Sequence, residues 1–417
     1  MTGSERGIIR ELAKRKLEIA NDRNNLERKK LWLSMRDGVQ TRPLILAEDG
    51  GVGDPRKPFE PDLQCSDEWA KGVERSLRWE IWRFEHLGDD RIVEPFIDMN
   101  WQIDISPNFG VEKVVHRVTD GGNMTACSWD APIKDIRQEF HRLKHRTFSV
   151  DRAKTAANRQ KIEELAGDIM PVRMRGSFWW TFGLTIQAID LIGLENLMLF
   201  MYDDPEGLHQ LMSFLRDDNL AFSEWCEKEG LLNLNNGNDY TGSGSQGYTG
   251  RLPADDYRPG SPVRRKDMWL LIESQETVGV GPDFYREFIF PYHRDIAGKF
   301  GMIYYGCCEP LNTRWNVIRE LPNLKACSIA PLCNQEAMAE ALKGDYIYSR
   351  KPNPTLISTQ NFDEAQIRGD LRDTLLICRK HGCRTELIMK DVHTLNNEPE
   401  RLARWVEIAR EEIARNW

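Results

Sequence analysis

Short apolar runs of strand length recur along this chain, and segments with a helical pattern separate them. A first short candidate strand covers residues 91–95, and from residue 169 onward most apolar runs are followed by a helical segment. Alternation of strands with helices predicts an α/β protein with a parallel sheet, and eight such units predict a closed (β/α)8 TIM barrel. The other predicted strands are 169–175, 231–235, 269–274, 302–307, 324–329, 346–349 and 386–392.

The first part of the chain does not follow this alternation. Residues 5–35 are charged and have a helical period. Residues 42–47 contain a short apolar run that would contact an apolar surface. We therefore interpret residues 1–88 as an N-terminal helical arm and loop, which could serve in a homodimer, and residues 89–417 as the barrel domain. The segment 100–149 has no place among the eight units, so it is either an insertion near the barrel mouth or a sign that the first unit is misassigned.

Composition limits the class of protein. A chain of 417 residues with 40% hydrophobic content can bury a large core. The net charge of -8, with cations scattered among acids, argues against nucleic acid as a partner. No stretch approaches the roughly 20 apolar residues of a membrane helix, and the first residues lack the apolar core of a secretory signal, so we expect a cytoplasmic protein. Nine cysteines without a regular spacing fit reduced thiols better than a disulfide framework.

The most informative segment is 301–310, where an apolar strand runs directly into two adjacent cysteines and a glutamate. Cys307, Cys308 and Glu309 end predicted strand five, and His393 follows predicted strand eight at the same mouth. In an extended strand Cys307 and Glu309 would share a face and Cys308 would point away, unless the following turn rotates it. Thiolate, imidazole and carboxylate groups are the ligands of catalytic zinc, so these four residues are the predicted metal ligands.

Each of these residues has an alternative role. Adjacent buried cysteines often pack as small apolar residues, and His393 is equally suited to a structural hydrogen bond. Cys333, after predicted strand six, could supply a further thiolate, but we interpret it as a packing residue.

A second polar group, formed by Glu273, Gln275 and Glu276, ends predicted strand four. A carboxylate in a partly dry cleft can be tuned for proton transfer, and we favour Glu276 for this catalytic role. Gln275 is a candidate for substrate binding. The alternative is that the two acids pair with the nearby Arg264 or Arg265.

The end of predicted strand two places aromatic walls beside a cation. Arg175 is followed closely by Trp179 and Trp180, which suits a flat or aromatic ligand. We therefore predict that Arg175 and Trp179 bind substrate, although both tryptophans would also suit the core.

Two further segments have a weaker signal. Residues 242–247 spell the glycine fingerprint of dinucleotide-binding folds, but they neither directly follow a strand nor open a helix. We therefore predict a flexible loop over the barrel mouth. Arg350 and Lys351 end predicted strand seven, where barrels often hold anionic groups.

Four segments carry a resemblance to a known family: Gly-Leu-Glu-Asn-Leu at 193–197, Tyr-Asp-Asp-Pro at 202–205, the segment 282–292, and Tyr-Tyr-Gly-Cys-Cys-Glu at 304–309. Together they make the chain from about residue 89 onward resemble the uroporphyrinogen decarboxylase superfamily of (β/α)8 barrels. The resemblance is closer to the methyltransferase branch of that superfamily.

The resemblance implies a metal site and a function. Corrinoid-linked methyltransferases of this branch typically carry His-x-Cys at the end of strand five and a cysteine after strand eight. Here the matching positions read Tyr305-Gly-Cys307 or Gly306-Cys-Cys308, and the strand-eight position falls near His393. The resemblance therefore implies a zinc-dependent enzyme that moves a methyl group between a small substrate and a corrinoid protein. The substrate would be of the methoxylated aromatic, methylamine or thiol type.

Two alternatives stay open. One is a lyase similar to uroporphyrinogen decarboxylase, although the Arg-Gln-Ala-Gly-Arg type of substrate motif of that enzyme is absent from this sequence. The other is a non-catalytic protein that binds a tetrapyrrole or a corrinoid.

Overall fold

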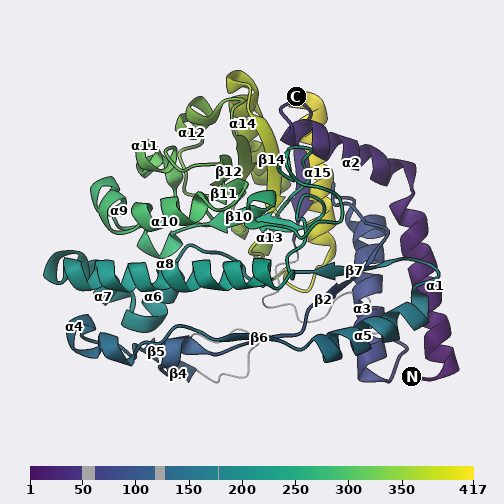
Figure 1. Ribbon diagram of the computed structural model, residues 1–417. Helices are drawn as coiled ribbons and strands as arrows, with labels where there is room; N and C mark the ends of the chain where they lie inside the picture. The colour runs from purple at the N-terminus through teal and green to yellow at the C-terminus, as the bar shows by residue number, and fades with distance from the viewer. Residues whose placement is uncertain (49–61, 118–126, 177) are drawn as a thin grey trace.

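The protein has an α/β architecture with parallel strands, as the alternation of apolar runs predicts (Figure 1). A computed structural model describes residues 1–48, 62–117, 127–176 and 178–417. Six strands form one parallel sheet in the order β1-β14-β13-β12-β11-β10. Their bounds are Leu44–Ala47 (β1), Arg384–Met389 (β14), Ile347–Arg350 (β13), Leu324–Ile329 (β12), Met302–Tyr305 (β11) and Trp269–Ile272 (β10).

A second parallel pair stands apart from this sheet. It consists of β2 (Ile97–Asn100) and β7 (Val172–Arg175). Within the described residues, no hydrogen-bonded ladder joins the pair to the six-stranded sheet. The eight parallel strands are therefore divided between two sheets.

Two of the predicted strands are placed differently in the structure. The segment 91–95 is not a strand, because its backbone is bound by the N-terminal helices: the N–H of Val93 donates to the side chain of Asn25 at 3.0 Å. The sheet instead begins with β1, from the region interpreted as an arm, and its four apolar residues are all buried. The predicted division at residue 88 stays a prediction, but β1 belongs to the sheet by its pairing with β14.

The predicted strand 231–235 is also absent, for a reason that its sequence contains. The side-chain amide of Asn235 accepts a hydrogen bond from the N–H of Trp269 and donates one to its carbonyl, at 2.8 and 3.0 Å. A side chain thus satisfies backbone groups of β10 that a neighbouring strand would otherwise pair with.

The N-terminal segment is helical, as its charged periodic pattern predicts. Two helices, α1 (Gly3–Ala20) and α2 (Arg23–Arg36), begin at Thr2 and Asp22, whose side chains accept backbone N–H hydrogen bonds. Helix α1 packs along α3 (Glu68–Trp82) and α5 (Arg152–Ala166) on one side of the molecule (Figure 1).

Helices follow the strands along most of the remaining chain. The longest, α8 (Pro205–Lys228), crosses the molecule with α6 (Thr185–Ile192) and α7 (Leu194–Asp203) packed beside it (Figure 1). The others are α9 (Pro282–Phe288), α10 (Phe290–Ala297), α11 (Trp315–Ile318), α12 (Gln335–Leu342), α13 (Thr355–Ser358), α14 (Glu364–His381) and α15 (Glu400–Asn416).

The segment 100–149, which had no place in the strand count, forms antiparallel pairs and a short helix. Its elements lie on the other side of α8 from the six-stranded sheet (Figure 1). They are β3 (Ile103–Ile105) paired with β6 (Phe148–Val150), β4 (Val114–Arg117) paired with β5 (Cys127–Asp130), and α4 (Ile136–Glu139).

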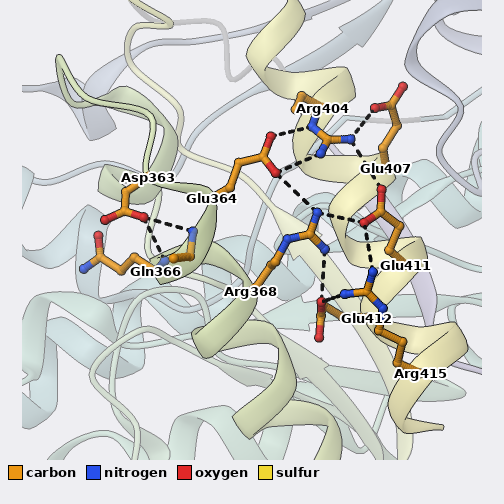
Figure 2. Close-up of polar contacts among 10 residues, drawn as sticks. Asp363, Glu364, Gln366, Arg368, Arg404, Glu407, Glu411, Glu412 and Arg415 are labelled. Atoms are coloured by element: carbon orange, nitrogen blue, oxygen red, sulfur yellow. Dashed lines mark hydrogen bonds and ion pairs between the residues drawn. The ribbon is translucent and has the colours of Figure 1, made fainter.

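Helices α14 and α15 pack against each other above buried apolar residues that include Leu371 and Trp405. Figure 2 shows the ion pairs at the rim of this contact, where arginines and glutamates of the two helices alternate. Exposed ion pairs of this kind contribute little individually. The apolar contact therefore stabilises the packing of α14 against α15, and the ion pairs add specificity to it. The residues of the network are Glu364, Arg368, Arg404, Glu407, Glu411, Glu412 and Arg415.

The six-stranded sheet is buried on both faces. One face packs against the strand-following helices, and the other packs against a short hairpin of β8 (Tyr240–Gly242) and β9 (Ser245–Gln246). The glycine-rich segment 242–247 is therefore enclosed in the core. The prediction of a flexible loop over the mouth is wrong, because small residues are needed here for close packing: a side chain at Gly242 would meet the ring of Tyr304 at 2.4 Å.

We expect Gly247→Ala to destabilise the protein by about 1–3 kcal/mol, because the added methyl group would meet the carbonyl oxygen of Asn235 at 2.0 Å. Urea denaturation of the purified variant measures this. Gly72→Ala makes the same chemical change within α3, where no atom lies within 4 Å, and is expected to be neutral or stabilising. Equal midpoints for the two variants would contradict the packing of the hairpin.

Candidate functional site

The carboxyl ends of the six-stranded sheet bring reactive side chains to one edge. Because the strands are parallel, residues that directly follow them lie at the same end of the sheet. These residues are Glu48 after β1, Glu273 after β10, Cys307 after β11, Lys351 after β13 and Lys390 after β14.

The two adjacent thiols meet in the structure. Strand β11 ends at Tyr305, and Gly306, with a φ of +95°, turns the chain out of the extended conformation. The Sγ atoms of Cys307 and Cys308 lie 3.6 Å apart as a result, so the turn rotates Cys308 toward its neighbour. Cys307 is buried and Cys308 is exposed.

The residues from β14 that reach this pair are Lys390 and Asp391. The Nζ atom of Lys390 lies 3.6 Å from the Sγ of Cys307 and 3.3 Å from the carboxylate of Asp391. The Sγ of Cys308 donates to the same carboxylate at 3.8 Å. Sequence analysis missed both residues, although the signal was available: a lysine and an aspartate directly follow the buried run of β14.

Hydrogen bonding within the pair separates the acidities of the two thiols. The thiol of Cys307 can donate to a thiolate at Cys308, which lowers the pKa of Cys308. The same bond, together with burial, raises the pKa of Cys307. Burial lowers the pKa of Lys390, but the negative charges of ionised Cys307 and of Asp391 outweigh this effect and raise it, so this lysine stays charged. Cys308 is therefore the more readily ionised sulfur.

Glu309 supports the turn that holds the thiols. Its carboxylate is buried and accepts the backbone N–H groups of Ser274 and Cys307, each at 2.9 Å. The hydroxyl of Ser328 donates to the carbonyl of Cys307 at 2.8 Å, so both backbone groups of Cys307 are fixed. Burial raises the pKa of Glu309.

Glu273, which directly follows β10, is a buried acid with a raised pKa. Burial raises the pKa of Glu273 to about 9, with further contributions from the charges of Glu309 and Glu276. Its Oε2 accepts the N–H of Gln275 at 3.0 Å, while Oε1 is buried without a hydrogen-bond partner among the described residues. Glu273 therefore carries a proton at neutral pH.

The carboxylate of Glu276 accepts the hydroxyl of Thr185 at 2.7 Å. The alternative pairing of these acids with arginines is not observed within the described residues, since Arg264 pairs with Asp256 and Asp267, and Arg265 pairs with Glu227.

An aromatic cavity of about 420 Å³ opens beside β10, the outermost strand of the six-stranded sheet. The indole N–H of Trp180 donates to the hydroxyl of Tyr240 at 3.0 Å, and both residues line the cavity. Trp179 also lines it, whereas Arg175 is not among the lining residues and pairs with one of them, Asp239. The lining consists of Gly176, Phe178, Trp179, Trp180, Asn233, Asn235, Asp239, Tyr240, Thr241 and residues 268–271.

Tyr240 is 45% exposed, so it stands at the open side of the cavity. Within the described residues, Gln275, the third predicted substrate-binding residue, is not among those that line the cavity.

The two cations at the end of β13, Arg350 and Lys351, are enclosed and do not offer an anion site. Arg350 donates to backbone carbonyls and pairs with Asp370 at 3.2 Å. The Nζ of Lys351 donates to the hydroxyl of Tyr304 at 2.9 Å and to the carbonyl of Ser349 at 3.0 Å. Burial lowers the pKa of Lys351 to about 7.

The four predicted metal ligands are only partly brought together. Two sulfurs bound to one tetrahedral zinc lie about 3.8 Å apart, so the spacing of Cys307 and Cys308 suits two such ligands. Both oxygens of Glu309 are occupied by backbone N–H groups, and His393 is exposed. Across the described ranges, no group of three or more His, Cys, Asp and Glu side chains is arranged to hold a metal. The four-ligand site stays a prediction.

Cys333 packs where the sequence interpretation placed it. Its Sγ accepts the N–H of Leu311 at 3.2 Å and is buried.

In the parts of the chain that the structure describes, no helix is both long enough and apolar enough to cross a membrane.

Comparison with known proteins finds distant similarity among solved structures. No protein-family model and no curated protein matches the sequence. Among solved structures the chain is similar to a methyltransferase from Methanosarcina mazei, with a TM-score of 0.48 and 11% sequence identity over 93% of this chain and 99% of that chain. A similarity of this size does not by itself assign a family or an activity.

We expect Glu273→Gln to gain stability relative to the unchanged protein as pH rises. The folded-state pKa of about 9 lies above the ordinary value of 4.5, so the folded protein holds a proton that the unfolded chain releases. Stability is therefore lost as pH rises between these values, and the amide removes this loss. Melting temperatures from pH 5 to 9 measure the difference. Glu287→Gln, on the exposed side of α9, controls for net charge, and parallel curves for all three proteins would contradict the assignment.

Lys351→Met should show the opposite pH dependence. The folded-state pKa of about 7 lies below the ordinary 10.5, so the folded protein binds fewer protons than the unfolded chain between these values. Stability of the unchanged protein therefore gains a contribution as pH rises from about 7 to 10.5. The variant should lack this gain in urea midpoints measured over that range. A variant curve parallel to that of the unchanged protein would show that Lys351 is charged and solvated.

Proposed function

We propose that the protein is a methyltransferase that acts on a small methylated substrate, with Cys307 and Cys308 at its reaction centre and a corrinoid protein as the second methyl carrier. The observation that carries this proposal is the thiol pair, 3.6 Å apart beside the ammonium of Lys390. It lies at the end of β11, within the segment 304–309 whose sequence resembles the methyltransferase branch. The proposal also includes the fold: a barrel of the uroporphyrinogen decarboxylase type, in which the pair β2–β7 is not hydrogen bonded to the six-stranded sheet within the described residues.

The aromatic cavity is the proposed substrate site. Its volume of about 420 Å³ is at the lower end of ligand pockets, which favours a small substrate over a tetrapyrrole. Its amides are already used: Asn233 binds the backbone at Gly176 and Leu234, and Asn235 binds Trp269. Recognition would therefore depend mainly on the rings of Trp179, Trp180 and Tyr240. This supports the methoxylated aromatic among the candidate substrates.

Three side chains have protonation states that suit methyl transfer. Cys308 is the more readily ionised thiol, and thiolates are soft nucleophiles suited to carbon transfer. Lys390 places a positive charge beside the sulfurs. Glu273 holds a proton at neutral pH that it can donate to a leaving oxygen, nitrogen or sulfur. Glu276, hydrogen bonded to Thr185, would orient the nearby turn in this scheme.

Zinc remains part of the proposal, with Cys307 and Cys308 as the residues that would hold it. The spacing of their sulfurs fits two ligands of one ion, and His393 would have to approach from its exposed position to act as a third. When bound, zinc would supply Lewis acid chemistry and lower the pKa of a bound thiol. Elemental analysis of purified protein, compared with its Cys307→Ser form, tests this part of the proposal independently of activity.

We expect Cys308→Ser to abolish methyl transfer, because a serine hydroxyl is not ionised at neutral pH and is a poor soft ligand. The assay follows transfer of an isotopically labelled methyl group from a panel of methoxylated aromatics, methylamines and thiols to a free corrinoid. Glu273→Gln should lower the rate by roughly 100-fold or more, the usual effect of losing a positioned proton donor.

Cys127→Ser provides the matched control, since Cys127 is exposed on β5 and should retain full activity when replaced. Unchanged activity of Cys308→Ser would exclude the thiol pair as the reaction centre. Release of carbon dioxide from a porphyrinogen without any methyl transfer would favour the lyase alternative.

A further inference from the structure

We propose that Cys307 and Cys308 form a reversible disulfide with each other when the protein meets a small disulfide oxidant, and that this modification closes the reaction centre. The inference concerns the same thiols as the proposed function, but it depends on their geometry and not on methyl transfer. It assigns an oxidative modification site to the turn between β11 and α11.

The two sulfurs already lie close enough for the bond to form with a local rearrangement of the turn. A disulfide requires about 2.0 Å between the sulfurs, and the two Sγ atoms already lie 3.6 Å apart on the same side of the turn. The turn is irregular, since it follows Gly306 at a φ of +95° and ends at Pro310. Residues 307–309 belong to no helix or strand, so small changes there break no hydrogen-bonded ladder.

The two cysteines differ in access, which gives them distinct roles. Cys308 is exposed and can be reached by an oxidant, whereas Cys307 is only 4% exposed and lies behind it. Of the nine cysteines, only Cys127 and Cys308 are exposed. Cys378 and Cys383 also lie near each other in the fold, but both are fully buried and cannot meet a dissolved oxidant.

The exchange follows ordinary thiol–disulfide chemistry. The thiolate of Cys308 attacks one sulfur of an oxidised small thiol such as glutathione disulfide, forms a mixed disulfide and releases one small thiolate, which takes up a proton. The thiolate of Cys307 then attacks the Sγ of Cys308, and a second small thiol leaves. The two protein thiols are oxidised, and one small disulfide is reduced to two thiols. Lys390, 3.6 Å from the Sγ of Cys307, stabilises the thiolate needed for the second step.

A disulfide at this position should be easily reduced. The Cα atoms of neighbouring residues lie about 3.8 Å apart, which is shorter than the roughly 4.4–6.8 Å found in most disulfides. Strain of this kind makes the bond more reducible, which is the property of labile and regulatory disulfides. The oxidised pair also loses its nucleophile and both candidate zinc ligands together.

The test counts free thiols in the full-length protein. Protein is incubated in buffers of varied glutathione to glutathione disulfide ratio with a chelator, quenched in acid, unfolded and alkylated, and its intact mass is measured. We expect the alkylated count to fall by two from nine, with a peptide containing both Cys307 and Cys308 as the oxidised species, and to return to nine with dithiothreitol.

Single-residue variants distinguish a disulfide between Cys307 and Cys308 from modification of one cysteine alone. Cys307→Ser should stop at the mixed disulfide and carry one glutathione, while Cys308→Ser should resist oxidation at this site because Cys307 is buried. Cys127→Ser should still lose two thiols. The proposal is overturned if Cys307→Ser also loses two thiols, or if the unchanged protein is modified at Cys127 while Cys307 and Cys308 both remain alkylated. Because this readout needs no substrate, it can succeed or fail independently of methyl transfer.

Discussion

The structure depends on one buried carboxylate, that of Glu386 in the middle of β14. It accepts hydrogen bonds from Arg36 of α2 at 3.0 Å and from Ser245 of the inner hairpin at 2.7 Å, and also from Ser349 of the neighbouring strand. A buried charge left without partners costs several kcal/mol, so the hairpin and α2 must both reach the inner face of the sheet. This requirement fits the position of β1, which follows α2 and pairs with β14 in the sheet.

The same network extends to the reactive end of the sheet. The inner hairpin that binds Glu386 also carries Ser243, which accepts a hydrogen bond from Lys390 at 3.3 Å, and Tyr240, which lines the aromatic cavity. Burial has opposite effects on nearby groups, since Glu273 retains its proton and Lys351 tends to lose one near neutral pH. Lys390 supplies the positive charge beside Cys307, because the negative charges near it, including that of Asp391, outweigh its burial.

Much of the fold could be predicted from local pattern. Strands β10 to β14 each overlap a predicted strand, because each contains a short run of buried apolar residues. The segment 231–235 has the same apolar pattern but is not a strand, since the amide of Asn235 takes over the backbone groups of Trp269. Conversely, β1 was interpreted as part of an arm, because a four-residue run beside charged helices contains no local sign of its distant partner β14.

For the site, the sequence by itself determined which chemistry was available: two adjacent thiols at the end of a strand, with acidic and aromatic residues after neighbouring strands. Only the tertiary structure decided which groups act together. It placed Lys390 and Asp391 beside the thiols, turned Glu309 toward backbone N–H groups, left His393 exposed and buried Glu273 so that its pKa is raised. The physical reason is that strand ends are specified by local apolar pattern, whereas side-chain direction and burial depend on turns and on packing between residues far apart in the chain.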